Sequence, residues 1–276
     1  MSRQRDGKLL SKKCWALLRS NKYFMLFPIL GVVLSLVPIL IFGAFTIVVA
    51  IANITWLAWV IGFIGLIFVN FAFVIAGAAL VASIDEELAG RNSHVGYGFG
   101  KAFGKLGPLF VWSIVRAVVS TILGLLRGRG NGAAAIVTTL IASAGAAAWS
   151  IITFFVTPHI MFDNDNAIDA IKKSAALVKA KWGTQLIGGV RIGLGVALIL
   201  IPAIVLILGG TWLLSMVPSL GVAAILIGVL LFLFGLLVGS ALRAIFSVAL
   251  YRFAQDESAI GDFTTAELAG VLTATK

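Results

Sequence analysis

The chain has 276 residues, of which 61% are hydrophobic and 12% are charged, and its mean hydropathy is +1.10. A soluble domain carries about twice that share of charged residues, so the composition excludes a soluble fold and predicts an all-α protein embedded in lipid. We attribute the net charge of +10 to membrane topology and to anionic headgroups rather than to nucleic acid.

Six apolar runs are long enough to cross a hydrocarbon core about 30 Å thick, which needs about 20 helical residues. We expect these spans at about 24–51, 57–83, 107–126, 133–156, 186–208 and 220–248. No cleavage site of small residues follows the first run, so we expect it to be retained as a span. The whole chain, residues 1–276, is therefore predicted to form one polytopic transmembrane domain.

The distribution of basic residues predicts the orientation of the spans. Sixteen lysines and arginines lie in the N-terminal segment, in two longer loops and in the tail at 249–276. The three intervening loops contain only Arg127 and Arg129. Because cytoplasmic loops carry the excess of basic residues, we expect both termini in the cytoplasm.

A polar–apolar stretch precedes each pair of spans, at 7–22, about 93–106 and about 166–183. In the last stretch, apolar residues recur at three- and four-residue steps, including Ile168 and Ile171, while most lysines lie elsewhere around the helix. Such a helix is suited to lie in the membrane interface. We therefore predict three units, each an interfacial amphipathic helix followed by a transmembrane hairpin.

Three arginines, Arg116, Arg191 and Arg243, lie inside the predicted spans and in their cytoplasmic half. A charge at the centre of a span costs about 2.5–3.5 kcal/mol even on a lenient insertion scale, so these residues are candidate contacts for an anion or a lipid headgroup. The favoured alternative is that each snorkels to the interface or pairs with a carboxylate. The candidate charge partners are Asp85, Glu86 and Asp163.

The segment Asp-Asn-Asp-Asn at 163–166 is similar to the start of a calcium-binding loop. It lacks the glycine and the final glutamate that such a loop requires at its sixth and twelfth positions. We therefore expect Asp165 or Asn166 to cap the helix that follows. The histidines His94 and His159 are each isolated in the sequence, so no metal site is predicted.

Three stretches of the chain carry a family resemblance: CWALLRSNKYFMLFPIL at 14–30, TFFVTPHIMFDNDNAIDAIKKSAALVKAKWG at 153–183, and ALYRFAQDESAIGDFTTAELAGVL at 249–272. They resemble a prokaryotic family of six-span membrane proteins of unknown function. That family is distantly similar to the membrane domain associated with some glycerophosphodiester phosphodiesterases, and Asp163 stands in place of its acidic residue. The resemblance implies a location in the prokaryotic cytoplasmic membrane and no established activity.

No serine–histidine–acid set and no facing pair of carboxylates stands out, so we expect a protein that is not an enzyme and needs no cofactor. The first functional hypothesis is a scaffold, a lipid-interacting protein or an assembly factor. Its expected partners are membrane lipids, anionic ones above all, and a membrane protein or a second copy of the chain. The alternative is a transporter or channel for a small anionic or lipid-like solute.

Overall fold

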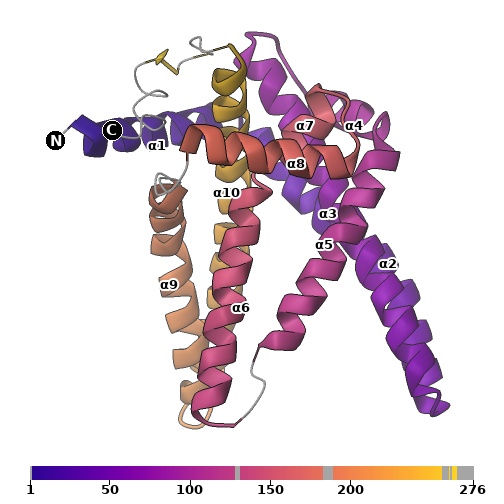
Figure 1. Cartoon of the computed structure of the whole chain (residues 1–276). Helices are drawn as coiled ribbons and strands as arrows, with labels where there is room; N and C mark the ends of the chain where they lie inside the picture. The colour runs from indigo at the N-terminus through magenta and orange to yellow at the C-terminus, as the bar shows by residue number, and fades with distance from the viewer. Residues whose placement is uncertain (1, 128–130, 183–188, 257–260, 262, 266–276) are drawn as a thin grey trace. The chain divides into compact units, whose positions relative to one another are not determined.

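The computed structural model describes residues 2–127, 131–182, 189–256, 261 and 263–265 (Figure 1). Side chains are described from residue 11 onward, apart from those of 181–182 and 189–195. All the long elements in this part of the chain are helices, which confirms the all-α prediction. Six of them are long and apolar enough to cross a membrane, at Lys22–Ile51, Thr55–Leu88, Leu106–Leu126, Ala133–Phe162, Val196–Leu213 and Pro218–Asp256. These six helices mark the chain as a membrane-embedded protein.

The chain divides into two compact units. The central unit, Leu26–Lys181, contains α2 (Leu26–Ile51), α3 (Thr55–Leu88), α4 (Val95–Phe103), α5 (Leu106–Leu126), α6 (Ala133–Ile152), α7 (Val156–Phe162) and α8 (Ala167–Leu177). The terminal unit, Met1–Met25 with Trp182–Lys276, contains α1 (Ser2–Ser20), a 3₁₀ turn (Lys22–Met25), α9 (Gly189–Leu213) and α10 (Pro218–Asp256). A π-helical turn, Val178–Trp182, follows α8.

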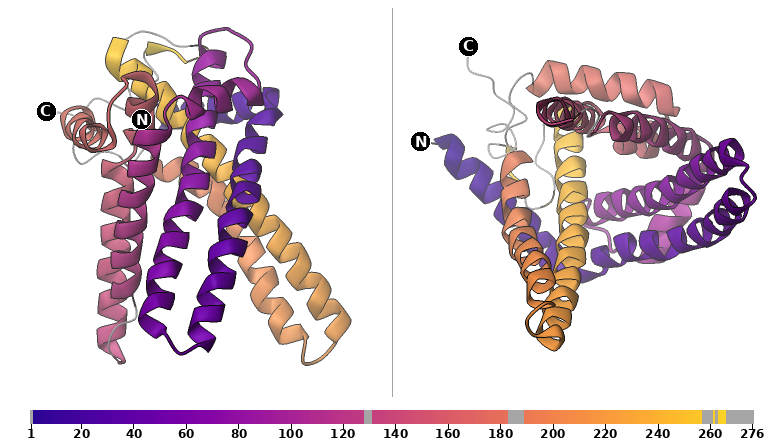
Figure 2. Two further views of the ribbon diagram at one scale, coloured as in Figure 1. Left: turned by 90° about the vertical axis from the view of Figure 1, so that its right-hand side faces the viewer. Right: turned by 90° about the horizontal axis from the view of Figure 1, so that it is seen from below.

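Helix α3 is the packing centre of the central unit. It lies along α2 and also contacts α4, α5 and α7, and Figure 2 shows α2 and α3 as neighbouring helices joined by a tight turn. Half of its most apolar window is buried, whereas only 6% of the corresponding window of the first span is buried. The buried part of α3 is rich in alanine, which lets neighbouring helices approach closely. Helix α2 instead presents most of its apolar side chains outward.

A glycine places α4 directly against α3. A Cβ atom on Gly98 would come within 3.0 Å of the Ala79 carbonyl oxygen, the Ser83 hydroxyl and the Phe27 ring. The Phe27 ring also stacks on Phe99 of α4, with 5.7 Å between the ring centroids. Only a residue without a side chain fits at this crossing, so Gly98 determines how closely the two helices approach.

The fourth apolar run breaks near its end. We expected one helix to about residue 156, but α6 ends at Ile152 and α7 begins at Val156. The buried hydroxyl of Ser174, on α8, donates to the Ile152 carbonyl at 2.5 Å and accepts from the Phe155 N–H at 3.1 Å. One side chain thus satisfies two backbone groups that the break leaves without helical partners. Figure 1 shows α8 lying across the end of α6 at a steep angle.

We predict that Ser174→Ala lowers the stability of the central unit by about 2–3 kcal/mol, because it leaves a buried carbonyl and a buried N–H unsatisfied. The apparent unfolding midpoint of the detergent-solubilised protein measures this effect. The control is Ser240→Ala, since the Ser240 hydroxyl is exposed and donates to the Leu237 carbonyl of its own helix. Equal midpoints for the two variants would contradict the anchoring role of Ser174.

In the terminal unit, α9 and α10 pack along one another, and both contact α1. Gly221, Gly228 and Gly235 recur at seven-residue steps on α10, and each approaches α9 closely. A Cβ on Gly228, for example, would lie 2.9 Å from the Ala203 carbonyl oxygen. On α1, the Cys14 side chain is fully buried, and this burial raises the pKa of its thiol to about 12.

Two helices extend well beyond the predicted spans. Helix α3 continues to Leu88 instead of ending near residue 83, and α10 continues to Asp256 instead of ending near residue 248. The predicted spans end a few residues before Asp85 and Arg252, but alanine, leucine, glutamate and arginine all favour helix, so the helices continue past these charges. At 1.5 Å per residue, α3 is about 51 Å long and α10 about 58 Å.

Candidate functional site

Charged side chains of the central unit gather in a region that we call the polar cap, residues 84–105 and 156–181. It comprises the last turn of α3, the helices α4, α7 and α8, and their connections. Helix α3 contacts α4 and α7, and α7 contacts α8. Figures 1 and 2 show these short helices at one end of the long helices of this unit. The cap is therefore the part of the unit in which polar chemistry is concentrated.

Glu86 organises one side of the polar cap. Its carboxylate accepts from the Arg91 guanidinium at 2.6 and 3.0 Å and from the Tyr97 hydroxyl at 2.6 Å. Burial, together with this hydrogen bond, raises the pKa of Tyr97 to about 12, so the phenol remains a donor at neutral pH. The Lys101 ammonium lies 5.5 Å from the centre of the Tyr97 ring. This arrangement joins the end of α3 to the start of α4.

Asp85 and Glu87, the acidic residues on either side of Glu86, are also half-buried at the C-terminal end of α3. A Glu87 oxygen accepts from the backbone N–H of Ser93 at 3.0 Å, which ties the α3–α4 connection to α3. Asp85 lies one residue before Glu86 on the same turn. The described contacts of Glu86 are with Arg91 and Tyr97, and the role of Asp85 or Glu86 as a partner of a span arginine stays a prediction.

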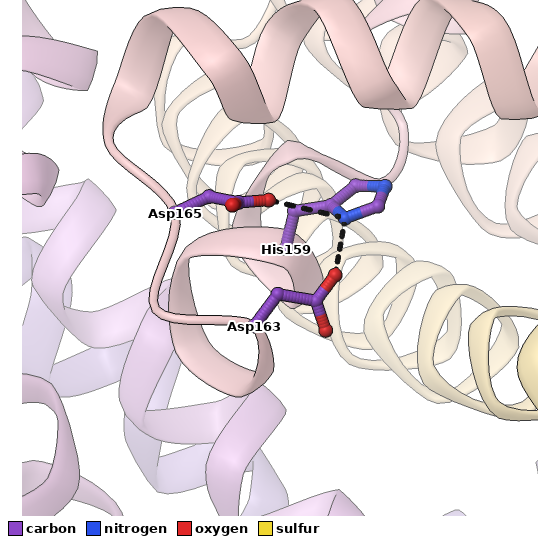
Figure 3. Close-up of side chains that lie close together, drawn as sticks. All are labelled: His159, Asp163 and Asp165. Carbon is purple, nitrogen blue, oxygen red and sulfur yellow. Dashed lines mark hydrogen bonds and ion pairs between the residues drawn. The ribbon is translucent and has the colours of Figure 1, made fainter.

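The second side of the polar cap brings together His159, Asp163 and Asp165 (Figure 3). The Nδ1 atom of His159 lies 2.9 Å from Asp163 Oδ2 and 3.6 Å from Asp165 Oδ2. The histidine side chain is 5% exposed, that of Asp165 11% and that of Asp163 29%. Helix α7 carries His159, Asp163 caps its C-terminus, and Asp165 comes from the connection to α8.

His159, a lone histidine in the sequence, lies beside two carboxylates in the structure. Its four-residue spacing to Asp163 places the two side chains on one face of a helix, and this spacing was the signal that sequence reasoning missed. Asp165 reaches His159 because of the turn after α7, where Asn164 has a φ of 59°. That left-handed conformation is not readable from residue spacing, although asparagine adopts it more readily than most residues.

The 163–166 connection is held at both ends. The Lys173 ammonium lies 2.6 Å from Asp165 Oδ1, and this hydrogen bond raises the pKa of Lys173. Lys105 donates to the side-chain oxygen of Asn164. The side-chain oxygen of Asn166 accepts from the Asp169 N–H at 2.9 Å, so Asn166 caps α8, which confirms the expected cap.

The buried faces of α4 and α8 consist mainly of small residues. On α8 these residues are Ala167, Ala170 and Ser174. The apolar face expected around Ile168 and Ile171 lies beside them, and Ile168 is 47% exposed. The small residues, rather than the isoleucines, form the buried face because small side chains let α8 approach α6 and α7 closely. On α4, Gly98 and Ala102 are buried, whereas Phe103 is 54% exposed.

The three span arginines have different surroundings. Arg116 is half-buried on α5 of the central unit, and Arg243 is exposed on α10 of the terminal unit. The side chain of Arg191 lies outside the described residues. A shared anion site formed by these arginines therefore stays a prediction.

A family model described as a family of unknown function (DUF6159) matches residues 49–261. This agrees with the expected resemblance to a family without an assigned activity. Nothing in the comparisons links the chain to the membrane domain of glycerophosphodiester phosphodiesterases. No curated protein and no solved structure matches the chain.

Proposed function

The chain belongs to the family DUF6159, whose function is unknown, and we propose from its own residues that it is a non-enzymatic membrane protein that binds anionic lipid headgroups. In this role it acts as a scaffold or assembly factor in the prokaryotic cytoplasmic membrane. Its macromolecular partner is a second membrane protein or another copy of the chain.

The observation that carries this proposal is the mixed outer surface of α4 and α8. Large apolar side chains such as Phe103 and Ile168 are exposed there, close in sequence to exposed lysines. The Lys172 side chain, for example, is 74% exposed. An apolar edge beside basic groups suits a helix that lies in the interface of an anionic membrane.

We further propose that the six spans form three hairpins, each preceded by an interfacial helix. The close packing of α2 with α3 and of α9 with α10, and the contact between α5 and α6, support this arrangement. The interfacial helices are α1, α4 and α8. With the basic residues oriented toward the cytoplasm, both termini and the polar cap lie on that side of the membrane.

Removing two exposed lysines of the polar cap tests lipid binding. We expect Lys172→Gln with Lys179→Gln to weaken retention of phosphatidylglycerol by about tenfold to thirtyfold, since each basic residue near the surface contributes about 1 kcal/mol. Native mass spectrometry of the full-length protein in neutral detergent measures the lipid retained per chain. The control replaces the same two residues with arginine, which keeps the charge. Equal retention by the glutamine and arginine variants would exclude a headgroup site at these two lysines.

Transport of a small anionic or lipid-like solute is the second candidate function. The half-buried Arg116 within α5 favours it, because a charge inside a span is costly and such residues commonly line solute or ion pathways. Solute flux into proteoliposomes discriminates between the two functions. A flux that Arg116→Ala abolishes, with lipid retention unchanged, would replace the lipid-binding proposal.

A further inference from the structure

We propose that His159, Asp163 and Asp165 form a binding site for a divalent transition-metal ion, with Zn²⁺ as the best fit. The three residues offer one imidazole nitrogen and two carboxylate oxygens, and these ligand atoms all lie within 4.8 Å of one another. This site is separate from the exposed lysines of the lipid-binding proposal.

Two of the three separations between ligand atoms are close to what a single ion requires. Zinc bonds to nitrogen and oxygen are about 2.0–2.2 Å long, so neighbouring ligands of a tetrahedral or octahedral ion lie about 3.0–3.5 Å apart. The separations of His159 Nδ1 from Asp163 Oδ2 and Asp165 Oδ2 are 2.9 and 3.6 Å. Figure 3 shows the two carboxylates directed toward the same ring nitrogen. A single ion would therefore need only small changes in the two separations from the histidine nitrogen.

The polar atoms in this cluster are buried to an unusual degree. The His159 side chain is 95% shielded from solvent, since only 5% is exposed. Asp165 Oδ2 is inaccessible to solvent and accepts no hydrogen bond from the described part of the chain. A buried carboxylate oxygen without a donor destabilises the fold. A metal ion bound between this oxygen and the ring nitrogen would remove that cost.

The donor set distinguishes among metals. Calcium and magnesium prefer an all-oxygen shell, which an imidazole nitrogen does not provide. Zinc and related first-row ions accept mixed nitrogen and carboxylate ligands. Three protein ligands leave a coordination position for water, and Asp163 is the most exposed of the three side chains.

Neighbouring groups hold the carboxylate of Asp165 in place. Lys173 contacts Asp165 Oδ1 at 2.6 Å and leaves Oδ2 directed toward His159. Such outer contacts orient metal ligands. Lys173 therefore fixes the orientation of the Asp165 carboxylate beside the histidine ring.

A zinc titration of the full-length, untagged protein in nanodiscs tests the proposal. After chelator treatment, Zn²⁺ alone is added in competition with a chromophoric chelator, and bound metal is counted by elemental mass spectrometry. We expect one Zn²⁺ per chain. His159→Gln and Asp165→Asn should each weaken binding by at least about tenfold, since even outer-shell changes cost 10–100-fold in metal affinity.

The chain has two histidines, and the other one is the matched control. His94 is exposed at the start of α4, so His94→Gln should bind Zn²⁺ as the wild type does. Where His159→Gln fails to fold, the more exposed Asp163→Asn serves instead, and a Zn²⁺-dependent rise in the wild-type unfolding midpoint should be lost in it. Equal zinc affinity in the His94 and His159 variants, or no binding by the wild type, would overturn the proposal and leave a purely structural ion pair.

Discussion

Gly98→Ala is expected to destabilise the protein by about 2–3 kcal/mol, although it adds a single methyl group to a helix. The new Cβ would meet the Ala79 carbonyl oxygen and the Ser83 hydroxyl of α3, together with the Phe27 ring. A backbone carbonyl within a helix does not move aside as the end of a flexible side chain does. Helix α4 must therefore shift away from α3, and the apparent unfolding midpoint in detergent should fall.

The same substitution two residues later should have the opposite sign. A Cβ on Gly100 would meet no atom within 4 Å outside its own helix backbone, so Gly100→Ala adds only helix propensity, worth about 1 kcal/mol at an exposed position. We expect its unfolding midpoint to equal or exceed that of the wild type. Equal unfolding midpoints for the two alanine variants would mean that close packing at Gly98 does not hold α4 against α3.

Gly228→Leu is expected to have the largest effect in the terminal unit. Its Cβ would lie 2.9 Å from the Ala203 carbonyl oxygen and 3.0 Å from the Ile207 backbone nitrogen. A whole leucine side chain at this point separates α9 from α10, at a cost of about 3 kcal/mol or more. Limited proteolysis of the purified protein should then cleave the connection at 214–217 faster than in the wild type.

Gly209→Leu provides the control on the partner helix. A Cβ on Gly209 would meet nothing within 4 Å, so the added side chain extends into open space. We expect proteolysis and the unfolding midpoint to stay near the wild-type values. A loss of stability as large as that of Gly228→Leu would mean that added bulk, rather than helix contact, is responsible.

The number and approximate places of the apolar helices follow from the sequence because hydrophobic length is a local property. The third span, expected at about 107–126, corresponds to Leu106–Leu126. The helix break after Ile152 was not predictable in the same way. It is accompanied by hydrogen bonds from Ser174, which lies 22 residues further along the chain, and only the fold brings them together.

The candidate site was only partly predictable for a similar reason. The cap of α8 by Asn166 follows from local hydrogen-bonding chemistry and was expected. The convergence of His159 with Asp163 and Asp165 combines a helical spacing with a turn in the left-handed region. For the three span arginines, the sequence identifies the charged positions inside apolar runs, but it does not predict which residues they contact.

The length of α3 has a mechanical consequence for the polar cap. The hydrocarbon core is about 30 Å thick, so a continuous helix of about 51 Å crosses it and carries Glu86 at its far end without an intervening joint. An overlong helix tilts further when the bilayer thins. Tilting a rod by about 10° moves a point about 25 Å from its pivot by roughly 4 Å. Any change in the tilt of α3 would therefore also move the polar cap, because one continuous helix joins it to the membrane span.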